Sequence, residues 1–181
     1  MAIFKFYQIY RSIKEVLEED MVMKIFPEYD TLPDKMPAKE QAELGKTIID
    51  RMDKLLDKNT VVKIRQMHTC NPSKEQVSII NKLKTKTKNL DEVLKEYSKF
   101  LTPGYVRKQG NTLNVSFGLK KCVCGMFRKL QTYEHMSKTW CECCNGHIIK
   151  TYSMICDKIK SSEIVETIAC GGNDCMFKVK I

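Results

Sequence analysis

The sequence predicts an α+β fold, in which a helical N-terminal part packs with a C-terminal antiparallel sheet of about four strands and one long helix. Apolar residues recur at helical spacing through the first part of the chain. After Pro103 the apolar residues alternate with polar ones around two glycine-containing turns, as in β-hairpins. A further stretch of helical spacing separates the two hairpins and provides the long helix.

Length and composition favour one ordinary globular domain over residues 1–181. The chain has 181 residues, is 43% apolar and has a mean hydropathy of −0.35, so it can bury a core without covalent cross-links. Within this domain, residues 1–102 form the helical scaffold and residues 103–181 form a cysteine-rich αβ module.

The scaffold is predicted to begin with an amphipathic helix over residues 3–20. Three prolines then make residues 26–37 a connecting loop, because proline removes a donor and disfavours helix before it. A helix over residues 38–58 follows, with Gly45 as its weak point. Asn59 and Thr60 are the expected caps of a short helix that ends near Cys70.

Two more helices complete the scaffold. Ser73 followed by Gln76 has the form of a capping box and predicts the start of a helix. The run KLKTKTK, residues 82–88, is expected to be a solvated loop after that helix. Residues 90–101 repeat the helical pattern.

The second part of the chain is expected to be two hairpins and a helix. Residues 105–117 alternate around Gly110, and residues 162–181 alternate around the turn 171–174. Between them a helix is predicted from about Thr139 to Asp157.

The chain has nine cysteines, and the motifs KKCVCG and WCECCNG place five of them between Cys122 and Cys144. The N-terminal segment is interrupted by lysine and arginine, unlike a signal peptide, and no apolar run could cross a membrane. We therefore expect a cytoplasmic protein with no membrane partner. In a reducing cytosol, clustered cysteines indicate metal ligands or redox groups more often than disulfides.

The spacing of the cysteines is compatible with a metal site. If Cys122–Cys124 is extended, both thiols point to one face and can reach one ion. The same holds for Cys141 and Cys143 if they precede the helix; if they are helical, Cys141 and Cys144 share a face and Cys143 turns away. Cys175 is a further candidate ligand. Thiolate ligands favour zinc, with an iron–sulfur cluster as the weaker alternative.

A reactive thiolate is the catalytic alternative to a metal site. Nearby lysines and arginines and the N-terminus of the helix would lower a thiol pKa, and His135 or His147 could assist a nucleophilic cysteine. The remaining thiols of Cys70, Cys156 and Cys170 are expected to be ordinary buried side chains. The positive residues expected to favour a thiolate are Lys120, Lys121, Arg128 and Lys129.

The net charge of +9 raises nucleic acid as a partner, but lysine supplies most of it and arginine little. Arginine makes the forked contacts that phosphates and bases prefer, so nucleic acid is the least favoured partner. A homodimer is compatible with the sequence.

The motifs KCVCG, WCECCNGHIIKTY and SSEIVETIACGGNDCMFKVKI resemble an uncharacterised cysteine-rich bacterial family related to vinyl-reductase-like domains, which are described as predicted hydrocarbon-binding modules. They are more loosely similar to 2-amino-thiazoline carboxylate hydrolase-like proteins. The resemblance covers about residues 105–181. It implies a hydrophobic pocket between sheet and helices, with Cys144 as a departure from the family pattern. Its recurrent cysteines would match Cys122, Cys124, Cys141, Cys143 and Cys175.

Three functions are therefore compared. The first is a binding or sensory protein for a small hydrophobic molecule, with a zinc site in its cysteine cluster. The second is a thiol- or zinc-dependent hydrolase, which a zinc ion with three protein ligands and a water would mark. The third is a zinc protein that binds nucleic acid, which requires a continuous basic face.

Overall fold

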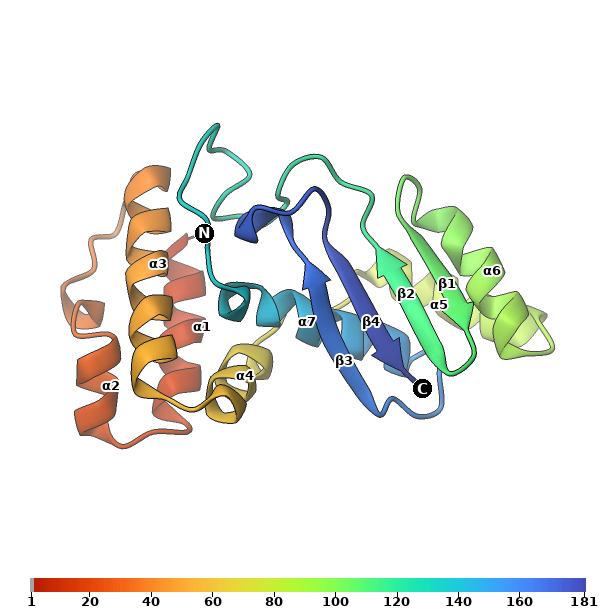
Figure 1. Cartoon of the computed structure of the whole chain (residues 1–181), viewed down its shortest axis with the longest axis horizontal. Coiled ribbons are helices and arrows are strands. Elements are labelled where there is room, and N and C mark those ends of the chain that lie inside the picture. The colour runs from red at the N-terminus through yellow and green to blue at the C-terminus, as the bar shows by residue number, and fades with distance from the viewer. Residues whose placement is uncertain (1) are drawn as a thin grey trace.

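The computed structural model describes residues 2–181 and has the predicted α+β architecture (Figure 1). Helices dominate the first part of the chain, and an antiparallel sheet of order β1-β2-β4-β3 dominates the second. None of the helices in this described part has the length and apolarity that crossing a membrane requires. The elements of the first part are α1 (Ala2–Lys14), α2 (Glu19–Ile25), η1 (Tyr29–Thr31), α3 (Ala38–Leu55), α4 (Lys58–Met67), α5 (Lys74–Lys86) and α6 (Leu90–Phe100).

The first predicted helix is wrong in its extent, because residues 3–20 form two helices instead of one. The chain turns after α1, and α2 packs back against it. The turn brings Phe26 at the end of α2 into edge contact with the aromatic rings of Phe6 and Tyr10. Tertiary packing of these rings therefore outweighs the helical propensity of the intervening residues.

The caps of the later helices agree in part with the prediction. Ser73 and Gln76 form both hydrogen bonds of the capping box at the start of α5. At α4 the cap is Asp57, whose carboxylate accepts from the main-chain N–H groups of Asn59 and Thr60, so these two residues were wrongly expected to be the caps. Helix α3 ends at Leu55, before the predicted boundary at residue 58.

The lysine run, predicted to be a loop, is mostly helical. Helix α5 continues to Lys86, so most of residues 82–88 are helical. Lysine is a good helix former, and an exposed helical turn can carry several of them.

The second part of the chain contains β1 (Tyr105–Gln109), β2 (Thr112–Ser116), α7 (Lys138–Ser153), β3 (Ser161–Glu166), η2 (Ile168–Cys170) and β4 (Met176–Lys180). Both predicted hairpins are present: β1 pairs with β2, and β3 pairs with β4. Gly110, with φ +56°, provides the left-handed position of the first turn. Strand β4 also pairs with β2, which joins the two hairpins into one sheet.

Helix α7 links the two parts of the chain. It runs behind the sheet in Figure 1, where it packs against β3, and its other side packs against α4. A glycine makes this contact close: a Cβ at Gly146 would lie 3.4 Å from Gln66 Cα on α4 and 2.3 Å from Thr69 Cγ2, just after α4. The predicted weak point, Gly45 of α3, is buried against the indole of Trp140 on α7. The cysteines of α7 therefore lie where the scaffold meets the sheet module.

Candidate functional site: a cluster of thiols

Cysteines from several segments gather beside α7. The loop between β2 and α7 carries Cys122 and Cys124, and the segment between β3 and β4 carries Cys170 and Cys175. Val123 is exposed whereas Cys122 is buried, so neighbouring side chains in this loop point in opposite directions. Residues 141–144 are helical, so the helical alternative of the sequence prediction applies. We refer to the cysteines of this region as the thiol cluster: Cys70, Cys122, Cys124, Cys141, Cys143, Cys144, Cys170 and Cys175.

Lys5 of α1 reaches into the thiol cluster. Its ammonium donates a hydrogen bond to Cys124 Sγ at 3.0 Å. Burial lowers the pKa of Lys5, but Cys124, and more weakly Cys143 and Cys70, outweigh this effect and raise it. The charged ammonium in turn helps to lower the pKa of Cys143. Lys5 lies more than a hundred residues from Cys124 in the chain, so no local pattern indicated the contact.

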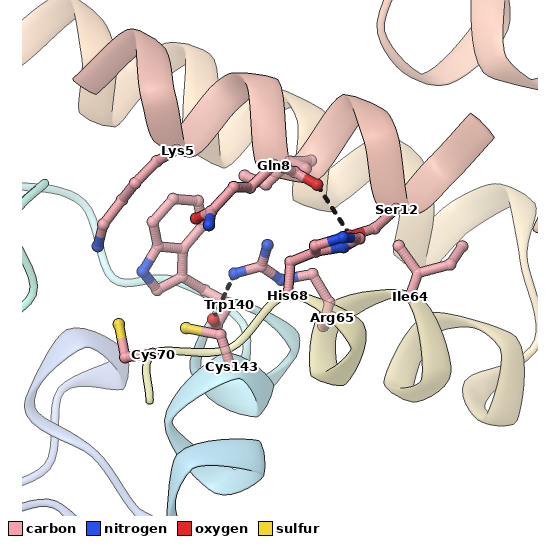
Figure 2. A pocket seen from close by; sticks show the side chains of 10 residues that line it. Lys5, Gln8, Ser12, Ile64, Arg65, His68, Cys70, Trp140 and Cys143 are labelled. Atoms are coloured by element: carbon pink, nitrogen blue, oxygen red, sulfur yellow. Dashed lines mark hydrogen bonds between the residues drawn. The ribbon is translucent and has the colours of Figure 1, made fainter. Parts of the chain in front are cut away.

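Arg65 of α4 is the second buried cation of the site. Its Nη2 donates to the main-chain oxygen of Trp140 at 2.9 Å, and its guanidinium lies 5.0 Å from the centroid of the Trp140 ring. Figure 2 shows the end of Cys143 beside this guanidinium. A hydrogen bond from the Cys144 thiol, followed by the charges of Arg65 and Lys5, lowers the pKa of Cys143 to about 6 against the effect of burial.

Cys141 points away from Cys143, toward η2. It forms a thiol pair with Cys170, and the hydrogen bond from Cys141 lowers the pKa of Cys170 to about 7. The same hydrogen bond and burial raise the pKa of Cys141. Cys170 is half-buried and Cys70 is exposed, so the prediction that both are ordinary buried side chains is wrong. Cys156 is buried and lies outside the thiol cluster, as predicted.

Like Cys141, the cluster members Cys122, Cys144 and Cys175 have raised pKa values. Burial raises the pKa of Cys122 to about 12, and burial also raises the pKa of Cys175. Each sulfur nevertheless accepts a main-chain hydrogen bond, from Cys124 for Cys122 and from Ile168 for Cys175. Burial raises the pKa of Tyr133 to about 12, and nearby thiols from the loop before α7, from α7 and from the segment before β4 add to this effect. These thiols are Cys122, Cys124, Cys141 and Cys175.

The five cysteines predicted as ligands therefore lie in one neighbourhood, around Tyr133 and Lys5. They do not form a finished coordination shell. Among residues 2–181, no three Cys, His, Asp or Glu side chains already surround a common point as metal ligands do. All nine cysteines are free thiols in the structure.

The groups expected to activate a thiolate are not those that contact it. Lys120, Lys121, Arg128 and Lys129 are exposed, while Lys5 and Arg65 supply the positive charge. His147 Nδ1 donates to the main-chain oxygen of Cys70 at 3.0 Å, and His135 packs beside Gly171. Within residues 2–181 neither histidine is hydrogen-bonded to a thiol.

Asp174 fixes the loop that carries Cys122 and Cys124. Its carboxylate accepts hydrogen bonds from the Ser116 hydroxyl and from the main-chain N–H groups of Gly118, Leu119 and Cys175. The turn between β3 and β4 therefore holds the start of the cysteine loop against the end of β2.

A second candidate site is an apolar pocket of about 250 Å³ between α6, α7 and β2. Aromatic and aliphatic side chains provide most of its wall, and His147, Thr151 and Gln76 add polar groups. The apolar lining includes Tyr97, Leu101, Val115, Phe117, Ile148 and Tyr152.

One comparison with known proteins finds a match. The model of a family of unknown function (DUF6144) matches residues 3–181, which is nearly the whole chain. No curated protein and no solved structure matches the chain.

Proposed function

We propose that this chain, which belongs to the family of unknown function DUF6144, is a binding or sensory protein whose thiol cluster takes up a thiophilic metal ion, zinc first. The observation that supports this most is the gathering of thiols from separate segments around Lys5 and Tyr133. Thiolate sulfur is a ligand that favours zinc, whereas the hard cations magnesium and calcium prefer oxygen ligands.

The surroundings of the thiols also favour metal uptake. A cysteine binds a metal ion as the thiolate, so groups that stabilise the thiolate raise the affinity. Lys5 donates to Cys124, and Arg65 lies beside Cys143. At Cys122 and Cys175, burial acts in the opposite direction, and the main-chain donors offset only part of it.

The proposed ligands are drawn from the set Cys122, Cys124, Cys141, Cys143 and Cys175, and Cys70 joins them because it interacts with Lys5. The thiols must rotate toward a common point, since the described side chains do not yet surround one. Four thiolates would fill the coordination shell of the zinc ion and exclude substrate. Three thiolates would leave one coordination position for water, as the hydrolase alternative requires. An iron–sulfur cluster needs the same donors.

The test is the metal content of protein purified under reducing conditions without chelator. We expect about one zinc ion per chain, released by Cys124→Ala. Cys156→Ala is the matched control, because Cys156 is a buried thiol outside the cluster. If Cys124→Ala folds and keeps the metal content of the control, Cys124 is not a ligand. If the unmodified protein binds no thiophilic metal when zinc is added, the proposal fails.

The apolar pocket between α6, α7 and β2 supports a second candidate function, the binding of a small hydrophobic molecule. Its volume of about 250 Å³ lies just below the range of typical small-molecule sites, so a ligand of about one aromatic ring is expected. Native mass spectrometry of the purified protein tests for such a ligand. Val115→Trp should fill the pocket and abolish its binding, whereas Val165→Trp, on an exposed position of β3, should not.

A further inference from the structure

A small cavity lies between α1, α4 and α7, on the scaffold side of the thiol cluster (Figure 2). Its volume is about 40 Å³, and a cavity needs about 10–15 Å³ for each water molecule. The cavity therefore has room for a small group of about three or four non-hydrogen atoms. The polar side chains that line it include Lys5, Arg65, His68 and Trp140.

Arg65 brings a positive charge into this cavity without a carboxylate partner. The residue is 7% exposed, and its hydrogen bonds go to the main-chain oxygens of Thr139 and Trp140. Across residues 2–181, no Asp or Glu oxygen lies within 4.0 Å of its guanidinium nitrogens. Figure 2 shows the terminal nitrogen that is not bonded to Trp140 directed toward Gln8. A buried charge is costly unless a counter-charge or several hydrogen bonds compensate it.

Trp140 supplies an independent sign of a missing acceptor. The residue is 2% exposed, and its indole Nε1 is buried without a hydrogen-bond partner in the described part of the chain. In Figure 2 this nitrogen lies on the side of the ring that faces the ends of Lys5 and Cys70. Buried indole N–H groups almost always have an acceptor, so an orphan one indicates a ligand or water.

The remaining wall adds the Lys5 ammonium, the Gln8 amide and the Cys143 sulfur near this end of the cavity. The ammonium of Lys5 has three N–H groups, one of which is used by Cys124 at 3.0 Å. The carboxylate of Glu15 lies at the opposite end, where its oxygen is 3.8 Å from His68 Nε2. The cavity thus combines two cations with an unused indole donor.

We propose that this cavity binds a small planar oxyanion of the size of bicarbonate, formate or nitrate, with Arg65 as the main charged contact. A planar O–C–O or O–N–O edge matches the fork of a guanidinium, and Lys5 and Trp140 Nε1 donate to the remaining oxygen. The site does not depend on the metal proposal, because its contacts are nitrogen donors and not sulfur ligands.

The sequence contains one tryptophan, so the fluorescence of Trp140 reports directly on this cavity. The whole metal-depleted protein is titrated with sodium formate, bicarbonate or nitrate against sodium chloride at constant ionic strength. We expect a saturable change in emission with the planar oxyanions and none with chloride, and the most effective of the three identifies the preferred anion. Arg65→Gln should abolish the change, whereas Arg51→Gln, which breaks the surface pair with Glu28, should retain it.

A second measurement needs no variant. Because Cys143 lines the same cavity, the bound anion should slow its alkylation by iodoacetamide several-fold, while Cys170, which is half-buried and does not line the cavity, serves as the internal reference in the same digest. The proposal is overturned if the emission responds equally to chloride, or if Cys143 is alkylated at the same rate in formate, bicarbonate, nitrate and chloride. The same titration with added zinc separates the two proposals, since the anion effect should occur with and without the metal.

Discussion

Replacing Asp174 by alanine tests whether one carboxylate holds the cysteine loop against the sheet. The change removes hydrogen bonds to the Ser116 hydroxyl and to three main-chain N–H groups, those of Gly118, Leu119 and Cys175. At about 1 kcal/mol each, their sum would be about 4 kcal/mol. Asp174 is only half-buried, so water can replace part of this loss. We expect the free energy of unfolding to fall by about 2–3 kcal/mol.

The assay is urea unfolding of the metal-depleted protein, followed by far-UV circular dichroism. Asp34→Ala, in the exposed loop before α3, is the matched control and should stay within about 0.5 kcal/mol of the unmodified protein. An Asp174→Ala variant as stable as this control would refute the idea that the carboxylate anchors the loop.

The effect should also depend on pH. Burial raises the pKa of Asp174, but the hydrogen bonds from Ser116 and the main chain outweigh it and lower the pKa below its ordinary value of 3.8. A carboxyl with a lowered pKa stabilises the fold above its unfolded pKa, and this contribution disappears as the pH falls through the folded pKa. The difference between the unmodified protein and Asp174→Ala should therefore be constant at neutral pH and shrink below about pH 4.

Three further predictions concern packing, capping and thiol reactivity. Gly146→Ala should lower the free energy of unfolding by about 1–3 kcal/mol, because its Cβ would lie 2.3 Å from Thr69 Cγ2; Gly125→Ala, whose Cβ would lie 3.8 Å from Lys5 Cε, is the control for urea unfolding. Ser73→Ala removes the side-chain acceptor of the capping box and should cost about 1 kcal/mol in the same assay, and an unchanged midpoint would contradict this. At pH 8, iodoacetamide should label Cys170, whose pKa is lowered to about 7, well before Cys122, whose pKa is raised to about 12; peptide mass spectrometry would show the opposite order if these environments are wrong.

Most of the fold could be predicted from the sequence because its signals are local. The capping box at Ser73 and the glycine turn at Gly110 involve residues a few positions apart, and the structure has both. The break between α1 and α2 could not be predicted in this way. It depends on Phe26 packing against the rings of α1, and the intervening residues are themselves compatible with a helix.

The candidate site was likewise predicted only where its signals are local. The spacing of Cys122, Cys124, Cys141 and Cys143 indicated a cluster, and the structure brings these thiols into one neighbourhood. The cations that act on them, Lys5 and Arg65, are separated from them by more than 50 residues and lie in ordinary amphipathic helices. Only the packing of α1 and α4 against α7 and its preceding loop assigns them to the site.

The origin of these two cations limits how the protein can be dissected. A fragment of residues 103–181 would keep every cysteine of the cluster except Cys70, but it would lose the ammonium and guanidinium groups that accompany them. Its thiols would then meet water instead of α1 and α4. Biochemical work on the cysteines therefore requires the intact polypeptide, and results obtained with the excised C-terminal portion would describe a different chemical environment.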